Sequence, residues 1–142
     1  MGLGLCLLLF YASWKAMNTL VFSVPECDLS LGPCVSKLAS GEAIELRIKP
    51  TRMPVLTSLK IAVKTENISA NKIIVTFKGS EMNMGEFQYS LVPQKNGVYT
   101  TQTILPSCIH EQMAWHTTVK IEGYRKHYIA SFVFINQRPE SV

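Results

Sequence analysis

Sulfur-bearing side chains gather in two short stretches of the sequence. Met82 and Met84 stand two residues apart, and an extended chain projects such residues to the same side. Cys108, His110 and Met113 lie together further along the chain. Thioether and thiolate sulfurs are soft ligands that suit Cu(I), whereas magnesium and calcium prefer oxygen ligands. We therefore interpret these five residues as a candidate copper site.

The same residues also have interpretations that need no metal. Methionine fills irregular gaps at the rim of a core, and His110 fits a solvated loop position. His116 and His127 have no partners at metal-ligand spacing, so we interpret both as strand or surface residues. The side chains of Glu81 and Glu86 fit a solvated loop face better than a catalytic carboxylate pair.

Other chemistry finds no support in the residue pattern. The chain has no Gly-rich phosphate loop after a strand, no Ser-His-Asp set with a nucleophile turn and no Cys-x-x-Cys motif. We therefore predict that the protein is not an enzyme. The net charge of +4 is too small and too evenly spread to indicate a nucleic-acid partner. With 47% apolar residues and no long polar tract, the chain is not a disordered one.

The cysteines point to an oxidising compartment. Cys27 and Cys34 enclose Asp-Leu-Ser-Leu-Gly-Pro, a short loop with a Gly-Pro turn that can close as a disulfide. Cys108 is then the odd thiol of the body, explained either by burial or by metal binding. The spacing alone leaves open which two of these three cysteines pair. Cys6 lies in the apolar N-terminal segment and is expected to be inert.

Residues 1–24 have the composition of a leader, with 17 of the apolar residues of the chain. The apolar run from Leu3 to Trp14 has the length of a signal-peptide core, and Lys15 interrupts it. Two interpretations remain open: a secretory signal with a weak cleavage site at Val21-Phe22-Ser23, and an uncleaved membrane anchor. A buried helix fits less well, because this run has no polar face. Signal and anchor both place the body outside the cytoplasm, where disulfides persist.

The remainder of the chain alternates apolar and polar residues with a period close to two, which indicates β-strands. We expect strands at residues 44–48, 59–64, 73–78, 87–91, 99–105, 115–122 and 128–135. The pattern predicts an all-β fold, an immunoglobulin-like antiparallel β-sandwich of about seven strands, with a small barrel as the alternative. The predicted organisation is a signal or anchor at 1–24, a linker at 25–42, the sandwich at 43–137 and a tail at 138–142.

These elements must bring the two sulfur stretches together. Asn96-Gly97 is the strongest hairpin signal in the chain, and it lies between the loops at 79–86 and 106–114. The chain runs out to this hairpin and returns over a similar length, so we expect the two loops to lie at one end of the sandwich. Trp115 is expected on a central strand with its indole in the core.

A family resemblance rests on motifs in the same order along the chain. They are Gly79-x-x-Met82-x-Met84-Gly85, Asn96-Gly97-x-Tyr99, Leu105-Pro106-x-Cys108 and Met113-x-Trp115. Over about residues 43–122 the sequence resembles the YtkA-like and FixH-like exported small domains of bacteria. This resemblance implies a membrane-tethered, immunoglobulin-like domain that faces the periplasm, and some relatives are linked to copper handling or cytochrome oxidase assembly.

The expected function follows from the candidate site and the resemblance together. We expect an accessory domain at the bacterial inner membrane, or free in the periplasm if the leader is cleaved. It would bind Cu(I) for delivery or for assembly of a respiratory oxidase, with a respiratory membrane complex or a copper protein as partner. The alternative is a metal-free interaction or scaffold module of the cell envelope.

Overall fold

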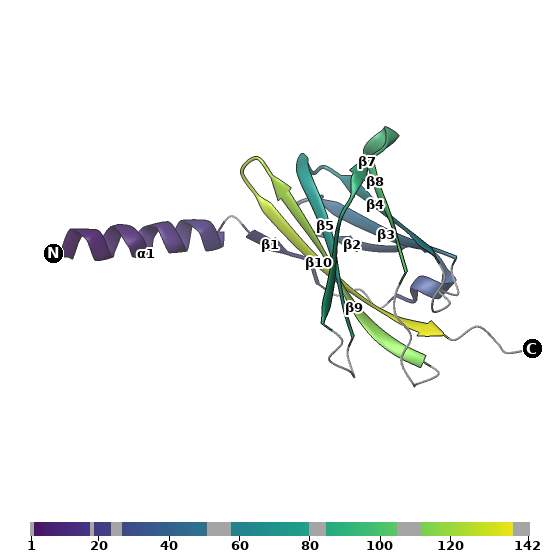
Figure 1. Cartoon of the computed structure of the whole chain (residues 1–142). Helices are drawn as coiled ribbons and strands as arrows, with labels where there is room; N and C mark the ends of the chain where they lie inside the picture. The colour runs from purple at the N-terminus through teal and green to yellow at the C-terminus, as the bar shows by residue number, and fades with distance from the viewer. Residues whose placement is uncertain are drawn as a thin grey trace, which may run out of the picture.

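The structure, a computed structural model, describes residues 2–17, 19–23, 27–50, 58–79, 85–104 and 112–137. One α-helix precedes a body built almost entirely of strands (Figure 1). The elements up to residue 66 are α1 (Gly2–Met17), β1 (Thr19–Val21), the 3-10 helix η1 (Leu29–Leu31), β2 (Cys34–Lys37), β3 (Ala43–Lys49) and β4 (Leu59–Glu66). The elements that follow are β5 (Ala70–Gly79), β6 (Glu86–Ser90), β7 (Val92–Pro93), the 3-10 helix η2 (Lys95–Gly97), β8 (Val98–Thr103), β9 (Gln112–Gly123) and β10 (His127–Gln137).

The strands form two five-stranded sheets in a sandwich-like arrangement. Sheet A has the order β1-β10-β9-β5-β6, and sheet B has the order β2-β3-β4-β8-β7. The chain passes from sheet A to sheet B at Leu91, between β6 and β7. The prediction of an all-β fold is confirmed, and the strands divide between two sheets rather than closing into one barrel.

Alternation of side chains explains why these segments form sheets. Along β4, Leu59, Ile61 and Val63 are buried while Lys60 and Lys64 are exposed, and the other long strands follow the same rule. The inward residues of both sheets form one hydrophobic core. Its largest fully buried side chains include Trp115, Phe77 and Phe132. Trp115 lies on β9, the middle strand of sheet A, as the sequence predicted.

All seven expected strands are present, as β3, β4, β5, β6, β8, β9 and β10, and the described residues add three short ones. The predicted Asn96-Gly97 turn joins β7 to β8. Gln94 donates its backbone N–H to the carbonyl of Val98, so the loop has three residues, Lys95–Gly97, and Asn96 and Gly97 both have a positive φ (64° and 72°). Two of the added strands, β1 and β2, lie before residue 43, so the sheets extend beyond the expected 43–137 interval.

The sandwich is not purely antiparallel, because β1 pairs in parallel with the first residues of β10. Phe22, the next residue, donates its backbone N–H to the carbonyl of Ile129 at 2.9 Å. Its ring is buried in the core at 6.2 Å from the ring of Tyr128. Part of the segment that composition assigns to a leader therefore contributes a strand and a core residue to the body.

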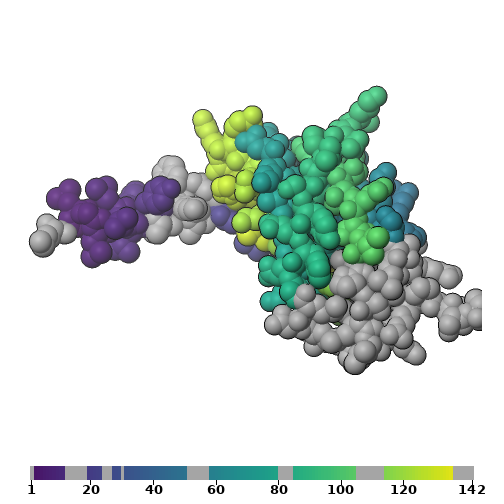
Figure 2. All heavy atoms as spheres, in the orientation of Figure 1, coloured from purple at the N-terminus to yellow at the C-terminus, as the bar shows by residue number. Residues whose placement is uncertain are grey.

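Helix α1 extends away from the strands (Figure 2). Its apolar side chains from Leu3 to Tyr11 are exposed, and none of them belongs to the core. Among the described residues, no helix has both the length and the apolar character needed to cross a membrane.

The strand registers define two ends of the sandwich. Lys49 pairs next to the start of β4, Leu59 pairs with Thr103 at the end of β8, and Gly79 pairs with Trp115 near the start of β9. We call this the distal end. The opposite, helix-proximal end contains the short link between β4 and β5 and the turn between β9 and β10. Helix α1 joins the body there, because Thr19 pairs with His127.

Candidate functional site

The predicted copper ligands are only partly covered by the structure. Met82, Met84, Cys108 and His110 lie outside the described residues. Met113 lies on β9, opposite Asn136 of β10, but only its backbone is described. The convergence of these five side chains therefore stays a prediction, and what the structure provides is the geometry of the strands on either side.

Those flanking strands meet at the distal end. Gly79, the last residue of β5, pairs directly with Trp115 of β9, and Lys78 pairs with Glu86 of β6. Directly opposed residues on antiparallel strands have Cα atoms about 4.5–5.5 Å apart. One sulfur-bearing segment thus follows the end of β5 and the other leads into β9, next to it in the same sheet. This agrees with the expectation that both segments lie at one end of the sandwich.

Aromatic side chains fill the core below this end. The rings of Trp115 and Phe87 lie 6.1 Å apart in an edge-to-face arrangement, and Phe77 meets Phe134 in the same way at 6.2 Å. Phe87 is half-buried by this contact. For a metal-free module we expect an exposed apolar patch near Phe87 and Met84; Met84 lies outside the described residues, so this patch stays a prediction.

Three buried polar atoms near the distal end have no hydrogen-bond partner among the residues that the structure describes. They are Thr103 Oγ1, Trp115 Nε1 and Thr117 Oγ1. A buried donor or acceptor left unpaired costs about 1–3 kcal/mol. Sequence reasoning treated Trp115 only as core and did not single out the two threonines. The interior toward the distal end is therefore more polar than the alternating pattern suggested.

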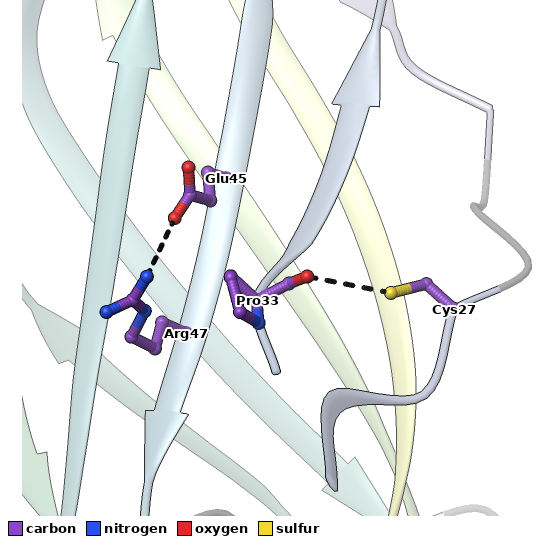
Figure 3. Close-up of polar contacts among 4 residues, drawn as sticks. All are labelled: Cys27, Pro33, Glu45 and Arg47. Atoms are coloured by element: carbon purple, nitrogen blue, oxygen red, sulfur yellow. Dashed lines mark hydrogen bonds and ion pairs between the residues drawn. The ribbon is translucent and has the colours of Figure 1, made fainter. Parts of the chain in front are cut away.

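The predicted disulfide between Cys27 and Cys34 is present. Cys34 is fully buried at the start of β2, and Leu29, inside the closed loop, is buried in the core. Cys27 Sγ lies 3.9 Å from the carbonyl oxygen of Pro33 (Figure 3). This contact is not a hydrogen bond, because the sulfur of a disulfide has no proton to donate. The disulfide uses both body cysteines that could have paired with Cys108, and Cys6 is free and exposed on α1.

Oxygen and nitrogen ligands do not form a second site in the described part of the chain. Within those ranges, no three His, Cys, Asp or Glu side chains lie close enough together to hold a metal ion. His116 is exposed on β9, and His127 is half-buried at the start of β10. The metal-site hypothesis therefore still rests on the sulfur ligands that the sequence predicts.

Perturbed carboxyl and phenol groups lie at the helix-proximal end instead. The hydrogen bond that Ser40 donates to the Glu42 carboxylate lowers the pKa of Glu42, and the charge of Lys126 acts in the same direction. Burial raises the pKa of Tyr128, and the negative charge of Glu42 adds to the effect. The Glu42 shift follows from a local hydrogen bond and the Tyr128 shift from burial, so we assign both to stability rather than to chemistry.

Fold and disulfide together define a sandwich-like β-domain with one covalent cross-link, between Cys27 and Cys34. No protein-family model matches the sequence, and no curated protein matches it. The fold is similar to part of a DUF4785 family protein from Legionella pneumophila subsp. pneumophila str. Philadelphia 1, with a TM-score of 0.50 and 15% sequence identity. The match covers 68% of this chain and 28% of that protein. The likeness concerns the fold alone, and these comparisons do not establish the YtkA-like or FixH-like resemblance.

Proposed function

We propose that this chain is an exported accessory domain, tethered to a membrane, that binds Cu(I) at its distal end. The observation that carries the proposal is the pairing of Gly79 with Trp115. The Met82–Met84 segment follows Gly79 at the end of β5, and the Cys108–Met113 segment leads into β9, so the two segments are attached to neighbouring strands. Delivery of the ion to a respiratory oxidase or another copper protein is the role that the sequence resemblance to YtkA-like and FixH-like domains suggests.

The donor set suits this ion. Met82, Met84 and Met113 offer neutral thioethers, and Cys108 offers a thiolate that would balance the single charge of Cu(I). His110 adds an imidazole nitrogen as a further ligand. A set dominated by thioethers gives up its ion more readily than one built from thiolates, which is what a delivery protein needs.

The proposed location rests on the disulfide and on α1. The cystine indicates an oxidising compartment, for which the bacterial periplasm is our proposal. The exposed apolar side chains of α1 would associate with the inner membrane. Cleavage at Val21-Phe22-Ser23 would remove β1 and the buried ring of Phe22, so the packing supports an anchor that is kept.

An anaerobic competition titration of Cu(I) against a chromophoric chelator tests the proposal. It requires the full chain in mild detergent, because a shortened chain beginning at residue 25 would lack β1. Removing a residue that only hydrogen-bonds to a metal ligand weakens metal affinity about 10–100-fold. Removing two proposed ligands with Met82→Ala plus Met84→Ala should therefore weaken Cu(I) binding by at least that factor. Cys108→Ser should do the same. Met53→Ala, a methionine outside the proposed set, is the control and should leave the affinity unchanged.

A metal-free interaction module is the second candidate. It is favoured by the like-charged pair that Lys49 and Lys60 form across β3 and β4. Wild-type Cu(I) affinity in the Met82, Met84 and Cys108 variants would reject the copper site in favour of this candidate. Neither role requires a catalytic reaction.

A further inference from the structure

The outer face of sheet B carries a concentration of cations that the overall charge of the chain does not reveal. Four basic residues of β3 and β4 point outward, because the residues between them are buried in the core. They are Arg47, Lys49, Lys60 and Lys64. We refer to these four residues as the basic face.

Like charges oppose each other directly in the basic face. Lys49 of β3 pairs with Lys60 of β4, which places their Cα atoms about 4.5–5.5 Å apart. On the far side of Lys60 stands Gln102 of β8, which is uncharged. Like charges directly opposite in a sheet are destabilising. The rest of the β3–β4 pairing is regular, so we expect the unfavourable Lys49–Lys60 pair to be kept for a functional reason.

Two carboxylates, Glu45 and Glu66, accompany the rest of the basic face. Glu45 Oε1 lies 3.6 Å from Arg47 Nη2 on the same strand, and both side chains project from the same side of β3 (Figure 3). Glu45 is also directly opposite Lys64 on β4. Glu45 is therefore shared by two cations. Glu66 is exposed two residues after Lys64, at the far end of β4 from Lys60, and no residue paired with Lys49 or Lys60 brings a carboxylate.

The outer face of sheet A is arranged differently. Lys72 pairs with Glu122, and Lys78 pairs with Glu86, so two of its three lysines have a carboxylate directly opposite. Lys120 stands between Ile74 and Ile129. Most lysines of sheet A therefore face a carboxylate, whereas the Lys49–Lys60 pair of sheet B, close to the distal end, faces none.

The surroundings of the basic face narrow the class of partner. The side chains beside the lysines are uncharged, and they belong to Ala62, Thr100 and Gln102. No aromatic side chain projects outward from β3, β4 or β8, so the stacking that single-stranded nucleic acids use is missing. The strand registers place Lys49 at the distal end, whereas α1 leads into β1 at the helix-proximal end, so a membrane holding α1 would not face Lys49.

We propose that the basic face is the docking surface for an acidic patch of a partner protein. Complementary charge would speed encounter, and it would offset the repulsion between Lys49 and Lys60 when the partner is bound. None of the four basic residues belongs to the predicted copper ligands, so the proposal goes beyond copper binding and stands whether or not the chain binds Cu(I).

The test uses the full chain in mild detergent and a fluorescein-labelled peptide of alternating Glu and Ser as the acidic probe. Binding is followed by anisotropy at low ionic strength and mapped by amide chemical shifts. The double variant Lys49→Glu plus Lys60→Glu should lose at least about tenfold in affinity. The matched control, Lys72→Glu plus Lys78→Glu on sheet A, changes the net charge by the same amount and should lose less than about threefold. Thermal melts show that each variant is folded.

Several outcomes would overturn the proposal. Equal losses in the two double variants would mean that only bulk charge attracts the peptide. Shifts confined to the β9–β10 turn, or no binding at low salt, would reject the basic face as the site. Tighter binding of a single-stranded oligonucleotide or of phosphatidylglycerol vesicles than of the peptide, lost in the sheet B variant, would assign the face to those partners instead. None of these results depends on the Cu(I) titration.

Discussion

Removing the Cys27–Cys34 disulfide should destabilise the domain by an amount that the loop length sets. The two cysteines are seven positions apart, and closing so short a loop restricts the unfolded chain by an entropy equivalent to about 2.5 kcal/mol at 25 °C. Cys34 is also fully buried, so its truncation to Ala adds about 1 kcal/mol for lost packing. We therefore expect about 2.5 kcal/mol from reduction alone and about 3.5 kcal/mol from Cys27→Ala plus Cys34→Ala.

Urea denaturation followed by circular dichroism measures both effects. With an m-value of about 1–3 kcal/mol per molar urea for a small domain, the loss of about 2.5 kcal/mol on reduction should lower the midpoint by about 0.8–2.5 M. Dithiothreitol should leave the double variant unchanged, since that variant has no disulfide to reduce. Cys6→Ala is the matched control, because Cys6 is free and exposed on α1 and should not move the midpoint.

Two results would refute this reasoning. If oxidised and reduced wild type denature at the same urea concentration, the loop that holds Leu29 in the core is ordered without the covalent constraint. If dithiothreitol destabilises the double variant as well, the effect of the reductant does not come from this cystine.

Three further predictions concern single side chains. Thr117→Val should raise the free energy of unfolding by about 1 kcal/mol, because it removes a buried hydroxyl that has no partner among the described residues; a lower urea midpoint would show that the hydroxyl is satisfied. Glu42 has a lowered pKa in the folded state, so its contribution to stability is present above the unfolded value of about 4.3 and is lost as the pH falls through the lower folded value. Ser40→Ala should flatten this acid decline in a series of thermal melts, and an unchanged decline would reject the role of the hydrogen bond. Lys60→Glu should stabilise the domain by about 0.2–1 kcal/mol, since it places a carboxylate opposite Lys49, and a lower melting temperature would contradict the like-charge argument.

The strands that the sequence predicted are those whose own residues define them. Ile44 to Ile48 and Leu59 to Val63 alternate so regularly that only one face can be buried, whichever strand lies beside them. The short loop between Cys27 and Cys34 was recognisable for the same reason, because sequence separation governs closure. Local information is sufficient for features of this kind.

Features that depend on a distant partner were not predictable. Thr19 to Val21 continue an apolar run and have the composition of a leader, and only their pairing with the start of β10 makes them a strand. Cys34 to Lys37 are too few to show a period without β3 beside them. Lys49 and Lys60 are each ordinary surface residues in the sequence, and their opposition exists only in the register of β3 with β4. The same limit applies to the candidate site, whose flanking strands are described and whose sulfur atoms are not.

The arrangement of the two ends bears on how such a domain could work. Helix α1 and β1 join the body at one end, while the flanks of the sulfur segments and the Lys49–Lys60 pair lie at the other. Two five-stranded sheets packed on a single core make a rigid spacer between these ends. A tether at the first end would therefore hold the second away from the membrane surface, where another protein can reach it. We infer that separating attachment from recognition is the main mechanical contribution of this fold, and that it would serve a copper-delivery domain and a metal-free docking module equally well.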